Sequence, residues 1–320
     1  MHLLIFQNSI IPVFTYGGTQ RDIWAQGKEM IKLGHKVTYL VKKGSSCSFA
    51  KILEYNPKNS IDSQIPEDVD LVHFHAPLSE KITKKPYMIT IHGNGQAGEV
   101  FDINSVFVSK NHAERHNSNM FVYNGLDFEE LGKVDLNARR KHLLFLAKAS
   151  RKEKNLEDCI WITHKLKRKL AIVGGRKISF SRYVKSYGMQ GGARKNLIIQ
   201  HADALLFPVK WHEPLGLAIL ESMYFGCPVF GSEYGSLPEL ISKERGFLSN
   251  NISELVEALK DMSQYNRRNC HEFVCDNFSA KKMTENYLKL YEQILNGKAL
   301  NSENPKSLII EKAKLLPLSK

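Results

Sequence analysis

The chain has 320 residues, of which 42% are hydrophobic and 24% are charged, so it is long enough to form two domains that each bury a core. Its five cysteines lack the spacing of a zinc site, which favours reduced thiols in a cytoplasmic protein. No apolar stretch approaches the roughly 18 residues that a membrane span requires, and the N-terminus lacks the basic region of a signal peptide. We therefore expect a protein that is neither secreted, membrane-spanning nor disordered.

The net charge of +12 is concentrated in one part of the sequence. Residues 141–200 contain 15 Lys and Arg but three acidic residues, whereas the charges on either side of this segment nearly cancel. Such a field attracts polyanions, namely a nucleotide diphosphate, an anionic lipid surface or nucleic acid. For any single lysine in the segment, a solvated basic face without a partner is the alternative.

In chain order, the predicted elements alternate between strands and helices. An apolar strand at 3–6 is followed by the turn TYGGT, by a helix over 21–33 that ends at Gly34, and by a strand over 36–41. Further short apolar runs lie at 70–75, 87–93, 105–109 and 120–125. Near-continuous apolar runs between helices are typical of parallel strands that are covered on both faces.

A second series of strands and helices begins after a polar segment, 127–142, that we interpret as a hinge near residue 138. Its predicted strands and helices lie at 142–150, 155–167, 169–175, 202–209, 217–226, 228–231 and within 252–294. The two series predict an α/β protein with two Rossmann-like, doubly wound domains that face a central cleft. We expect the domains at 1–138 and 139–280, followed at 281–320 by a helix, whose return to the first domain stays open, and a polar, peripheral tail.

The most specific motif is WHEPLGLAILESMYFGCPVFGSEYGSLPEL, in which seven residues separate Glu213 from Glu221. Pro214 and Gly216 stand where a helix should begin, and the free N–H groups of a helix start form an anion site. If both glutamates lie on this helix, their carboxylates are about 12 Å apart along its axis, so they could accept hydroxyls from two ends of one elongated ligand. Two ordinary exposed helix glutamates are the alternative interpretation.

This segment closely resembles the donor-binding signature of the retaining glycosyltransferases of family 4, which have the GT-B fold. Their motif has a Glu, a Pro, an aromatic residue or Leu, a Gly and a second Glu, and a Gly-Cys-Pro-Val-like strand follows. In that family the first Glu contacts the donor sugar and the second Glu holds the ribose of the nucleotide. The resemblance implies these roles for Glu213 and Glu221, and it places near the diphosphate the amides of Leu215, Gly216 and Leu217.

The resemblance extends over most of the chain. The turn before the first helix is similar to a family loop in which glycines approach a phosphate, here Gly17 and Gly18, and Thr19 is expected to cap the helix. The strand YMITIHGN resembles the one that carries a histidine into the cleft, here His92. A further strand, KLAIVGG, matches a strand-to-glycine loop of the donor domain at Gly174 and Gly175.

Family members also place an Arg and a Lys against the donor diphosphate. In LAKASRKEKN, Lys154 matches the lysine, and either Lys148 or Arg151 stands for the arginine, because Ala147 replaces the usual glycine and the alignment shifts. In the short segment 188–196, Lys195 either wraps the base or diphosphate or belongs to a plain flexible loop.

Metal motifs are set aside. The Asp68–Asp70 pair has no further acidic ligand nearby, and the spacing of His112 and His116 lacks the Glu offset of the zinc proteases. The sequence also lacks a P-loop and the glycine pattern of a dinucleotide-binding loop.

The resemblance implies a metal-independent, retaining hexosyltransferase without a cofactor, whose donor is a nucleotide-diphosphate sugar, favoured as a UDP-sugar. The acceptor is expected to be a hydroxyl of a glycan or lipid-linked molecule in polysaccharide biosynthesis, and the basic segment suits contact with the anionic inner face of a membrane. His92, Glu213 and Lys154 are the expected catalytic groups. The alternatives are a nucleotide-sugar epimerase or hydrolase of the same fold and, less favoured, a nonenzymatic polyanion-binding protein; nucleic acid is not expected, because the basic segment lacks interleaved aromatic residues.

Overall fold

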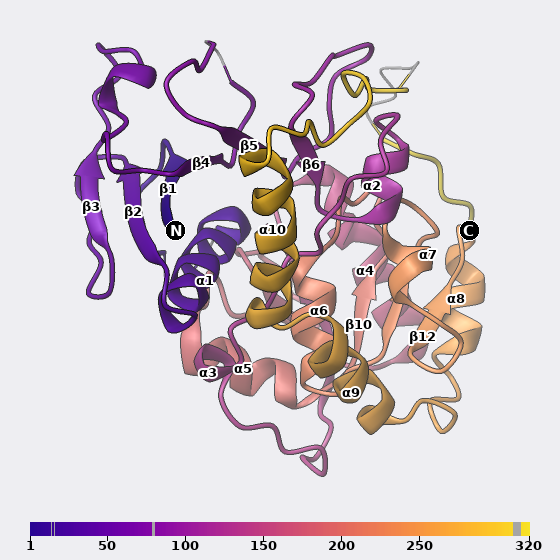
Figure 1. Cartoon of the computed structure of the whole chain (residues 1–320). Coiled ribbons are helices and arrows are strands. Elements are labelled where there is room, and N and C mark those ends of the chain that lie inside the picture. Colours follow the sequence, from indigo (N-terminus) through magenta and orange to yellow (C-terminus); the bar gives the residue numbers. More distant parts are fainter. Residues whose placement is uncertain (14, 16, 79–80, 310–314) are drawn as a thin grey trace. The chain divides into compact units, whose positions relative to one another are not determined.

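The computed structural model describes residues 1–13, 15, 17–78, 81–309 and 315–320. Contacts between residues divide it into two compact units (Figure 1). The described residues of Met1–Val13, Gly17–Asp127 and 280–309 form the first unit, and Phe128–Ser279 with residues 315–320 form the second. Each unit contains one six-stranded parallel sheet. This architecture confirms the prediction of two doubly wound α/β domains.

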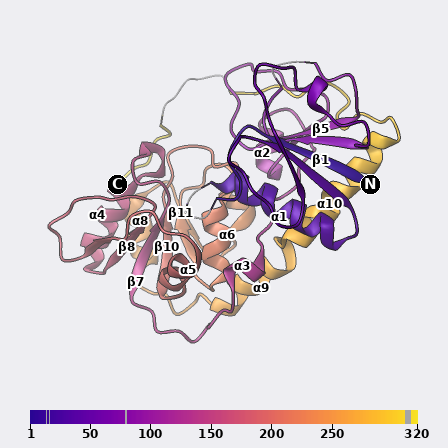
Figure 2. The same ribbon diagram turned by 90° about the vertical axis from the view of Figure 1, so that its left-hand side faces the viewer.

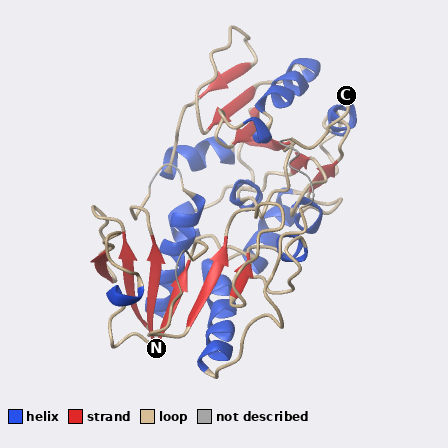
Figure 3. Ribbon diagram, turned by 90° about the horizontal axis from the view of Figure 1, so that it is seen from above, coloured by secondary structure: helices blue, strands red, loops and turns tan. Residues whose placement is uncertain are grey.

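The sheet of the first unit has the strand order β3-β2-β1-β4-β5-β6, and its parallel strands lie side by side (Figure 3). The strands are β1 (His2–Gln7), β2 (Lys36–Val41), β3 (Lys51–Glu54), β4 (Leu71–Phe74), β5 (Tyr87–Ile91) and β6 (Ser105–Phe107). In the central register, Leu3 of β1 stands opposite Val37 on one side and Leu71 on the other. The chain therefore builds the sheet outward from β1 in both directions.

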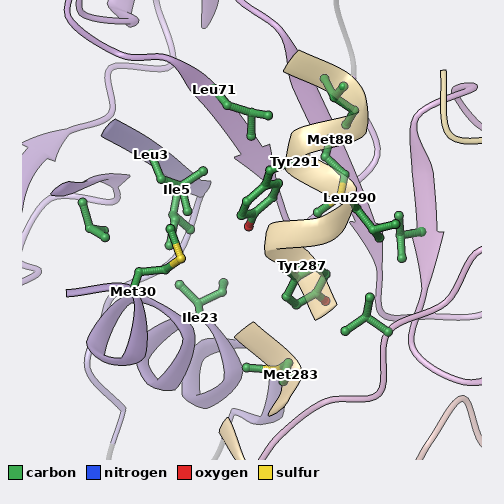
Figure 4. Close-up of a cluster of buried hydrophobic side chains, with 14 of the residues drawn as sticks. Leu3, Ile5, Ile23, Met30, Leu71, Met88, Met283, Tyr287, Leu290 and Tyr291 are labelled. Atoms are coloured by element: carbon green, nitrogen blue, oxygen red, sulfur yellow. The ribbon is translucent and has the colours of Figure 1, made fainter. Parts of the chain in front are cut away.

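Both faces of this first sheet are buried, because successive strand side chains point to opposite sides. Leu3 and Ile5 face a core that is covered by α1 (Gly18–Lys32) and α10 (Ala280–Leu295), which lie side by side (Figures 1 and 2). From α10, Tyr287 and Tyr291 reach into this core (Figure 4). The alternate residues of β1, such as Leu4, join a second core with loops around η1 (Asp62–Gln64) and with α2 (Lys110–Glu114).

The sheet of the second unit has the strand order β12-β11-β10-β7-β8-β9. Its strands are β7 (His142–Leu146), β8 (Leu170–Val173), β9 (Val184–Ser186), β10 (Ala202–Phe207), β11 (Val229–Gly231) and β12 (Gly246–Leu248). One face packs through Phe145 and Leu206 on α4 (Leu156–Leu166) and α8 (Ile252–Ala258). The remaining helical segments are α3 (Phe128–Leu131), η2 (Lys152–Lys154), α5 (Gly192–Gln200), α6 (Leu217–Tyr224), α7 (Leu237–Leu240) and α9 (Arg267–Asn277).

Two sequence-based expectations for residues 120–142 differ from the structure. The apolar run at 120–125 forms no extended strand; Phe121 makes an isolated bridge to Phe107. The predicted hinge at 127–142 begins as part of the second unit, because the Phe128 ring stacks on Tyr224 with 4.8 Å between ring centroids, and Asn196 donates to the Leu131 carbonyl at 3.0 Å. The first unit therefore ends at Asp127, eleven residues before the hinge position near 138 that the polar sequence predicts.

The C-terminal segment is integrated into the fold. The prediction of a peripheral tail, which was based on its polarity, is therefore wrong. After α10, Leu300 is buried, and the Phe101 N–H donates to the Pro305 carbonyl at 2.8 Å in the first unit. In the second unit, the Ile252 N–H donates to the Ser319 carbonyl at 2.8 Å, and Lys320 lies 2.9 Å from the Asp158 carboxylate. Polar residues are compatible with this course because the contacts are made largely by the backbone.

None of the helices in the described residues has both the length and the hydropathy of a membrane-spanning segment. The five cysteines are all free thiols.

Candidate functional site

Glu213 lies in an extended segment after β10 and before α6, not on the helix itself. Gly216, with φ of 91°, precedes the first helical residue, Leu217, and so separates the carboxylate from the helix. The prediction that both carboxylates lie along one helix is therefore wrong, because Glu213 stands just ahead of α6. The alternative of exposed glutamates is also wrong, since Glu213 is 7% and Glu221 3% exposed.

The backbone of Glu213 is held by the turn that follows β11. Glu213 forms an isolated bridge with Gly235, and the Ser236 N–H donates to the Glu213 carbonyl at 2.9 Å. A Cβ atom on Gly235 would stand 2.3 Å from both the nitrogen and the oxygen of Glu213, and Gly235 has φ of 69°. A side chain is excluded there, which explains the small residue before Ser236 in the motif.

The Glu213 carboxylate is fixed by two donors on one oxygen. Lys154 Nζ lies 2.5 Å from Oε2, and the indole Nε1 of Trp211 donates to the same oxygen at 2.7 Å. Lys154 Nζ also lies 4.4 Å from the centre of the Trp211 ring, within the range of a cation–π interaction. The structure thus brings together two predicted residues and adds Trp211, which sequence reasoning missed.

Trp211 left a signal in the sequence that is clear only afterwards. It stands two residues before Glu213, which in an extended segment places both side chains on one side of the chain. Arg151 also approaches this indole, with its guanidinium carbon 5.4 Å from the ring centre, and it pairs with Glu153. Lys148 is exposed on the preceding turn.

Glu221 is held by a second lysine. Lys195 Nζ lies 2.5 Å from Glu221 Oε1, and both side chains are less than a tenth exposed. Lys195 belongs to α5, so residues 192–196 are helical and the flexible-loop alternative is wrong for this lysine. Breaking a buried ion pair leaves an uncompensated charge, so each partner holds the other in place.

Gly174 and Gly175 allow two loops to approach each other after β7 and β8. A Cβ on Gly174, with φ of 112°, would lie 2.1 Å from the Ala147 carbonyl oxygen, and one on Gly175 would lie 2.8 Å from the Cβ of Ala149. Lys154, these glycines and Glu213 all follow the carboxyl ends of adjacent strands, where open α/β sheets bind ligands.

Gly17 and Gly18 begin α1 in the first unit. Gly17 is the N-cap residue, with φ of 129°, and Gly18 is the first helical residue. The helix has no side-chain cap hydrogen bond, so the prediction that Thr19 caps it is wrong. The first turn of a helix can bind an anion through its free N–H groups, and such a role for Gly17 and Gly18 stays a prediction.

His92 follows β5 in the first unit and is backed by two further imidazoles. His92 Nε2 lies 3.0 Å from His75 Nδ1, and the His75 ring packs on His73 with 4.0 Å between centroids. His73 Nδ1 lies 2.7 Å from the Tyr291 hydroxyl of α10. Burial lowers the pKa of His92 to about 4 and that of His73 and His75 well below its usual range, so all three rings are neutral at pH 7.

The residues that the sequence set aside have structural partners. His112 Nε2 lies 3.0 Å from the Gly93 carbonyl and His116 Nε2 accepts from the Gly95 N–H, while Asp70 accepts from the His2 N–H at 2.7 Å. Within the described part of the chain, no three His, Cys, Asp or Glu side chains cluster as metal ligands would.

Comparison with known families and proteins adds to this geometry. Residues 140–264 match the family model of the glycosyl transferases group 1. A curated relative, an uncharacterized 41.2 kDa protein in the cps region of Klebsiella pneumoniae, is 28% identical over 97 residues. That match spans 28% of this chain and 27% of the relative, so it concerns about a quarter of either protein.

Solved structures match nearly the whole chain. Sucrose-phosphate synthase from Thermosynechococcus elongatus aligns with a TM-score of 0.74 and 16% identity over 93% of this chain and 100% of its own. AviGT4, a glycosyltransferase involved in avilamycin A biosynthesis, aligns with a TM-score of 0.70 and 18% identity over 92% of this chain and 98% of its own. HepE from Anabaena, solved in complex with UDP-glucose, aligns with a TM-score of 0.64 and 14% identity over 92% of this chain and 100% of its own. The fold of this chain is thus the GT-B fold, and its second unit carries the sequence pattern of the glycosyl transferases group 1.

Proposed function

We propose that this protein is a retaining glycosyltransferase that moves a hexose from a nucleotide-diphosphate donor to a hydroxyl of a glycan or lipid-linked acceptor. The observation that carries the proposal is the pair of buried carboxylates, Glu213 and Glu221, which are held by the half-buried Lys154 and the buried Lys195. Buried charged pairs cost desolvation free energy, so their placement beside a ligand-binding edge favours a functional role over a stabilising one.

Glu221 is proposed to accept hydrogen bonds from the ribose of the donor. Lys195 Nζ contacts Oε1, and this contact orients the carboxylate before the nucleotide arrives. A neutral amide at this position would keep the shape of the side chain but would lose the charge-assisted hydrogen bonds to two hydroxyls.

Glu213 is proposed to read the hydroxyls of the donor sugar. Lys154 and Trp211 both bind Oε2, and Oε1 makes no hydrogen bond within the described residues, so Oε1 is the oxygen available to a ligand. The amides of Leu215, Gly216 and Leu217 likewise donate to no acceptor in the described part of the chain. They are therefore suited to receive the diphosphate at the start of α6.

In the reaction, the bond between the anomeric carbon and the diphosphate oxygen breaks, and its electron pair leaves with the phosphate. The acceptor oxygen bonds to the anomeric carbon on the same face, and its proton passes to the departing phosphate. Lys154 and Arg151, which share the Trp211 ring, are proposed to stabilise the negative charge that develops there. We propose that these cations make a metal ion and a cofactor unnecessary, and that Gly17 and Gly18 offer further amides.

His92 is proposed to contact the donor sugar as a neutral imidazole. Because burial lowers its pKa to about 4, it acts at pH 7 as a hydrogen-bonding group and not as a cation. The family match and the UDP-glucose bound by HepE favour a uridine nucleotide, and the relative in a cps region favours a polysaccharide acceptor. The free cysteines agree with a cytoplasmic site of action, and the basic segment with contact at an anionic membrane.

The first test measures binding of UDP and of 2′,3′-dideoxy-UDP by calorimetry, to the wild type and to Glu221→Gln. We expect the wild type to bind UDP at least about tenfold more tightly than the dideoxy analogue, and Glu221→Gln to bind both alike. Glu157→Gln, an exposed glutamate of α4, is the matched control. Equal binding of the two nucleotides by the wild type would overturn the role of Glu221.

The second test incubates the protein with a radiolabelled UDP-hexose and a mixture of lipid-linked and free glycans. Transfer to an acceptor, with the anomeric configuration of the donor kept in the product by NMR, is the expected result. Release of free sugar or of an epimerised nucleotide, without any labelled acceptor, would contradict the proposal and identify a hydrolase or epimerase of this fold.

A further inference from the structure

A cavity of about 600 Å³ lies in the second unit, at the opposite edge of the sheet from the candidate functional site. Its lining includes residues near the starts of three strands: Lys141 and His142 at β7, Lys169 and Leu170 at β8, and Asp203 at β10. Glu213, Lys154 and Gly174 instead follow the carboxyl ends of these strands. A four-residue strand such as β8 separates the two edges by about 13 Å.

The lining of this cavity is strongly basic. Six cationic side chains reach it from the segment before β7, the segment before β8, and the edge strand β9. These side chains are Arg139, Arg140, Lys141, Arg168, Lys169 and Lys185. The cavity therefore collects six of the 17 Lys and Arg side chains of residues 139–200 into one concavity, with one acidic side chain, Asp203, among its lining residues.

The single acidic side chain does not balance these charges. Asp203 pairs with Arg168 at 2.6 Å, and Arg168 also donates to the Leu259 carbonyl. The other five cations take part in no ion pair within the described residues. Like charges gathered in a concave surface raise each other's free energy, and they attract a counter-anion that carries several charges.

The residue types and the volume of the cavity favour a small phosphate-bearing ligand over a nucleic-acid strand. Tyr187 is the aromatic residue of the lining, so the stacking platforms that a nucleic-acid strand requires are absent from this part of the described surface. The volume is within the range of pockets for small ligands, and the cations converge on it from several segments. Lysines and arginines that converge in this way favour clustered phosphate groups.

We propose that this basic cavity is a second ligand site, which binds a compact group carrying two or more phosphates and is separate from the candidate functional site. The shared chemistry is a dense phosphate cluster, which a soluble polyphosphate or the headgroups of an anionic lipid can supply. Neither the ligand nor the cavity takes part in the proposed sugar transfer, so the two proposals stand or fall separately.

The test uses the full chain with inorganic tripolyphosphate, measured by calorimetry in excess UDP, and with sedimented vesicles of phosphatidylcholine with and without phosphatidic acid. The cavity variant is Lys141→Gln/Lys169→Gln/Lys185→Gln. The control variant, Lys165→Gln/Lys177→Gln/Lys243→Gln, removes the same charge from exposed lysines of the same unit outside the cavity. Lys154→Met reports on any phosphate bound at the functional site.

We expect the cavity variant to bind tripolyphosphate, or vesicles with phosphatidic acid, at least about tenfold more weakly than the wild type, with the control and Lys154→Met unchanged. If the cavity variant loses binding of tripolyphosphate, the ligand is a soluble polyphosphate. If it loses binding of the phosphatidic acid vesicles alone, the ligand is a lipid headgroup. The proposal is overturned if both triple variants bind the probes equally weakly or if Lys154→Met loses probe binding. It is also overturned if the wild type binds neither probe. UDP binding by the cavity variant should equal that of the wild type, whatever the outcome of the transfer assay.

Discussion

The two units differ in the polar networks that lie beside the carboxyl ends of their central strands. In the first unit, the buried network beneath the sheet is neutral: His73 lies against Tyr291, and His75 lies against His92. In the second unit, the buried polar side chains beside the sheet are charged and paired, as in Lys154–Glu213 and Lys195–Glu221. Neutral networks avoid the cost of desolvating an ion, whereas ion pairs incur it and keep charges available to a ligand. The comparison therefore supports the proposal that the second unit binds a charged ligand.

The strongest way to break this comparison is to remove the carboxylate of Glu213. Glu213→Ala leaves Lys154 and the Trp211 N–H without their shared acceptor, and we expect kcat/KM for sugar transfer to fall by about a thousandfold or more. Initial rates with saturating acceptor measure the effect, and Glu157→Ala serves as the exposed control. Turnover at the wild-type rate in Glu213→Ala would show that the charged pair has no part in the reaction.

The next prediction concerns the backbone that holds this carboxylate. Gly235→Ala places a Cβ 2.3 Å from the Glu213 backbone, so we expect a loss of about 3 kcal/mol or more in unfolding free energy, together with reduced turnover. Gly132→Ala is the matched control, because Gly132 has φ of 76° but no atom within 4 Å of the added Cβ. That control should lose about 1 kcal/mol. Similar losses in denaturant titrations of both variants would show that the close approach to Glu213 is unimportant.

Acid should distinguish the units directly. Burial lowers the native pKa of six histidines in the first unit: His35, His73, His75, His92, His112 and His116. Below about pH 6.5 the unfolded chain binds protons that the native unit does not. The free energy of unfolding therefore decreases as the pH is lowered, by up to about 1.4 kcal/mol per pH unit for each histidine. The decrease continues until the native pKa is reached, which is about 4 for His92.

In the second unit, His142 has its pKa lowered by burial, and the buried partners of the sheet edge are ion pairs. Hydrogen exchange measured by mass spectrometry between pH 7 and pH 4.5, corrected for intrinsic rates, should show peptides of β4 and β5 losing protection before those of β7 and β10. Loss of protection in the reverse order would contradict the contrast between a neutral and a charged interior.

The smallest expected effect sharpens the role of Trp211. Trp211→Phe keeps a ring near Lys154 but removes the N–H that donates to Glu213, so we expect kcat/KM to fall by about tenfold while the unfolding free energy changes little. Trp161→Phe, in α4, is the control, since Trp161 contacts Lys165 and Lys320 away from Glu213. An unchanged kcat/KM in Trp211→Phe would leave Lys154 as the sole group that positions the carboxylate.

The strands and helices near the sheets could be predicted from the sequence, because buried parallel strands such as β1 and β8 consist of short apolar runs. The pairing of Glu213 with Lys154 and of Glu221 with Lys195 could not, because these contacts join residues 59 and 26 positions apart. Trp211 was missed for a different reason: it lies two residues before its acceptor, but the sequence does not reveal that the segment is extended there, with Glu213 bridged to Gly235. The integration of the polar tail rests on backbone hydrogen bonds, which side-chain patterns do not encode.

The return of α10 to the first unit determines the order in which the chain can mature on the ribosome. Six buried residues from the C-terminal part of the chain complete a hydrophobic core whose other buried members lie within the first 122 residues: Met283, Tyr287, Leu290, Tyr291, Ile294 and Leu300. The nascent N-terminal half must therefore wait, with one side of its sheet uncovered, while the whole of Phe128–Ser279 is synthesised. During this interval the exposed apolar surface is a substrate for chaperones and a hazard for aggregation, and an N-terminal fragment produced without α10 would remain in that state.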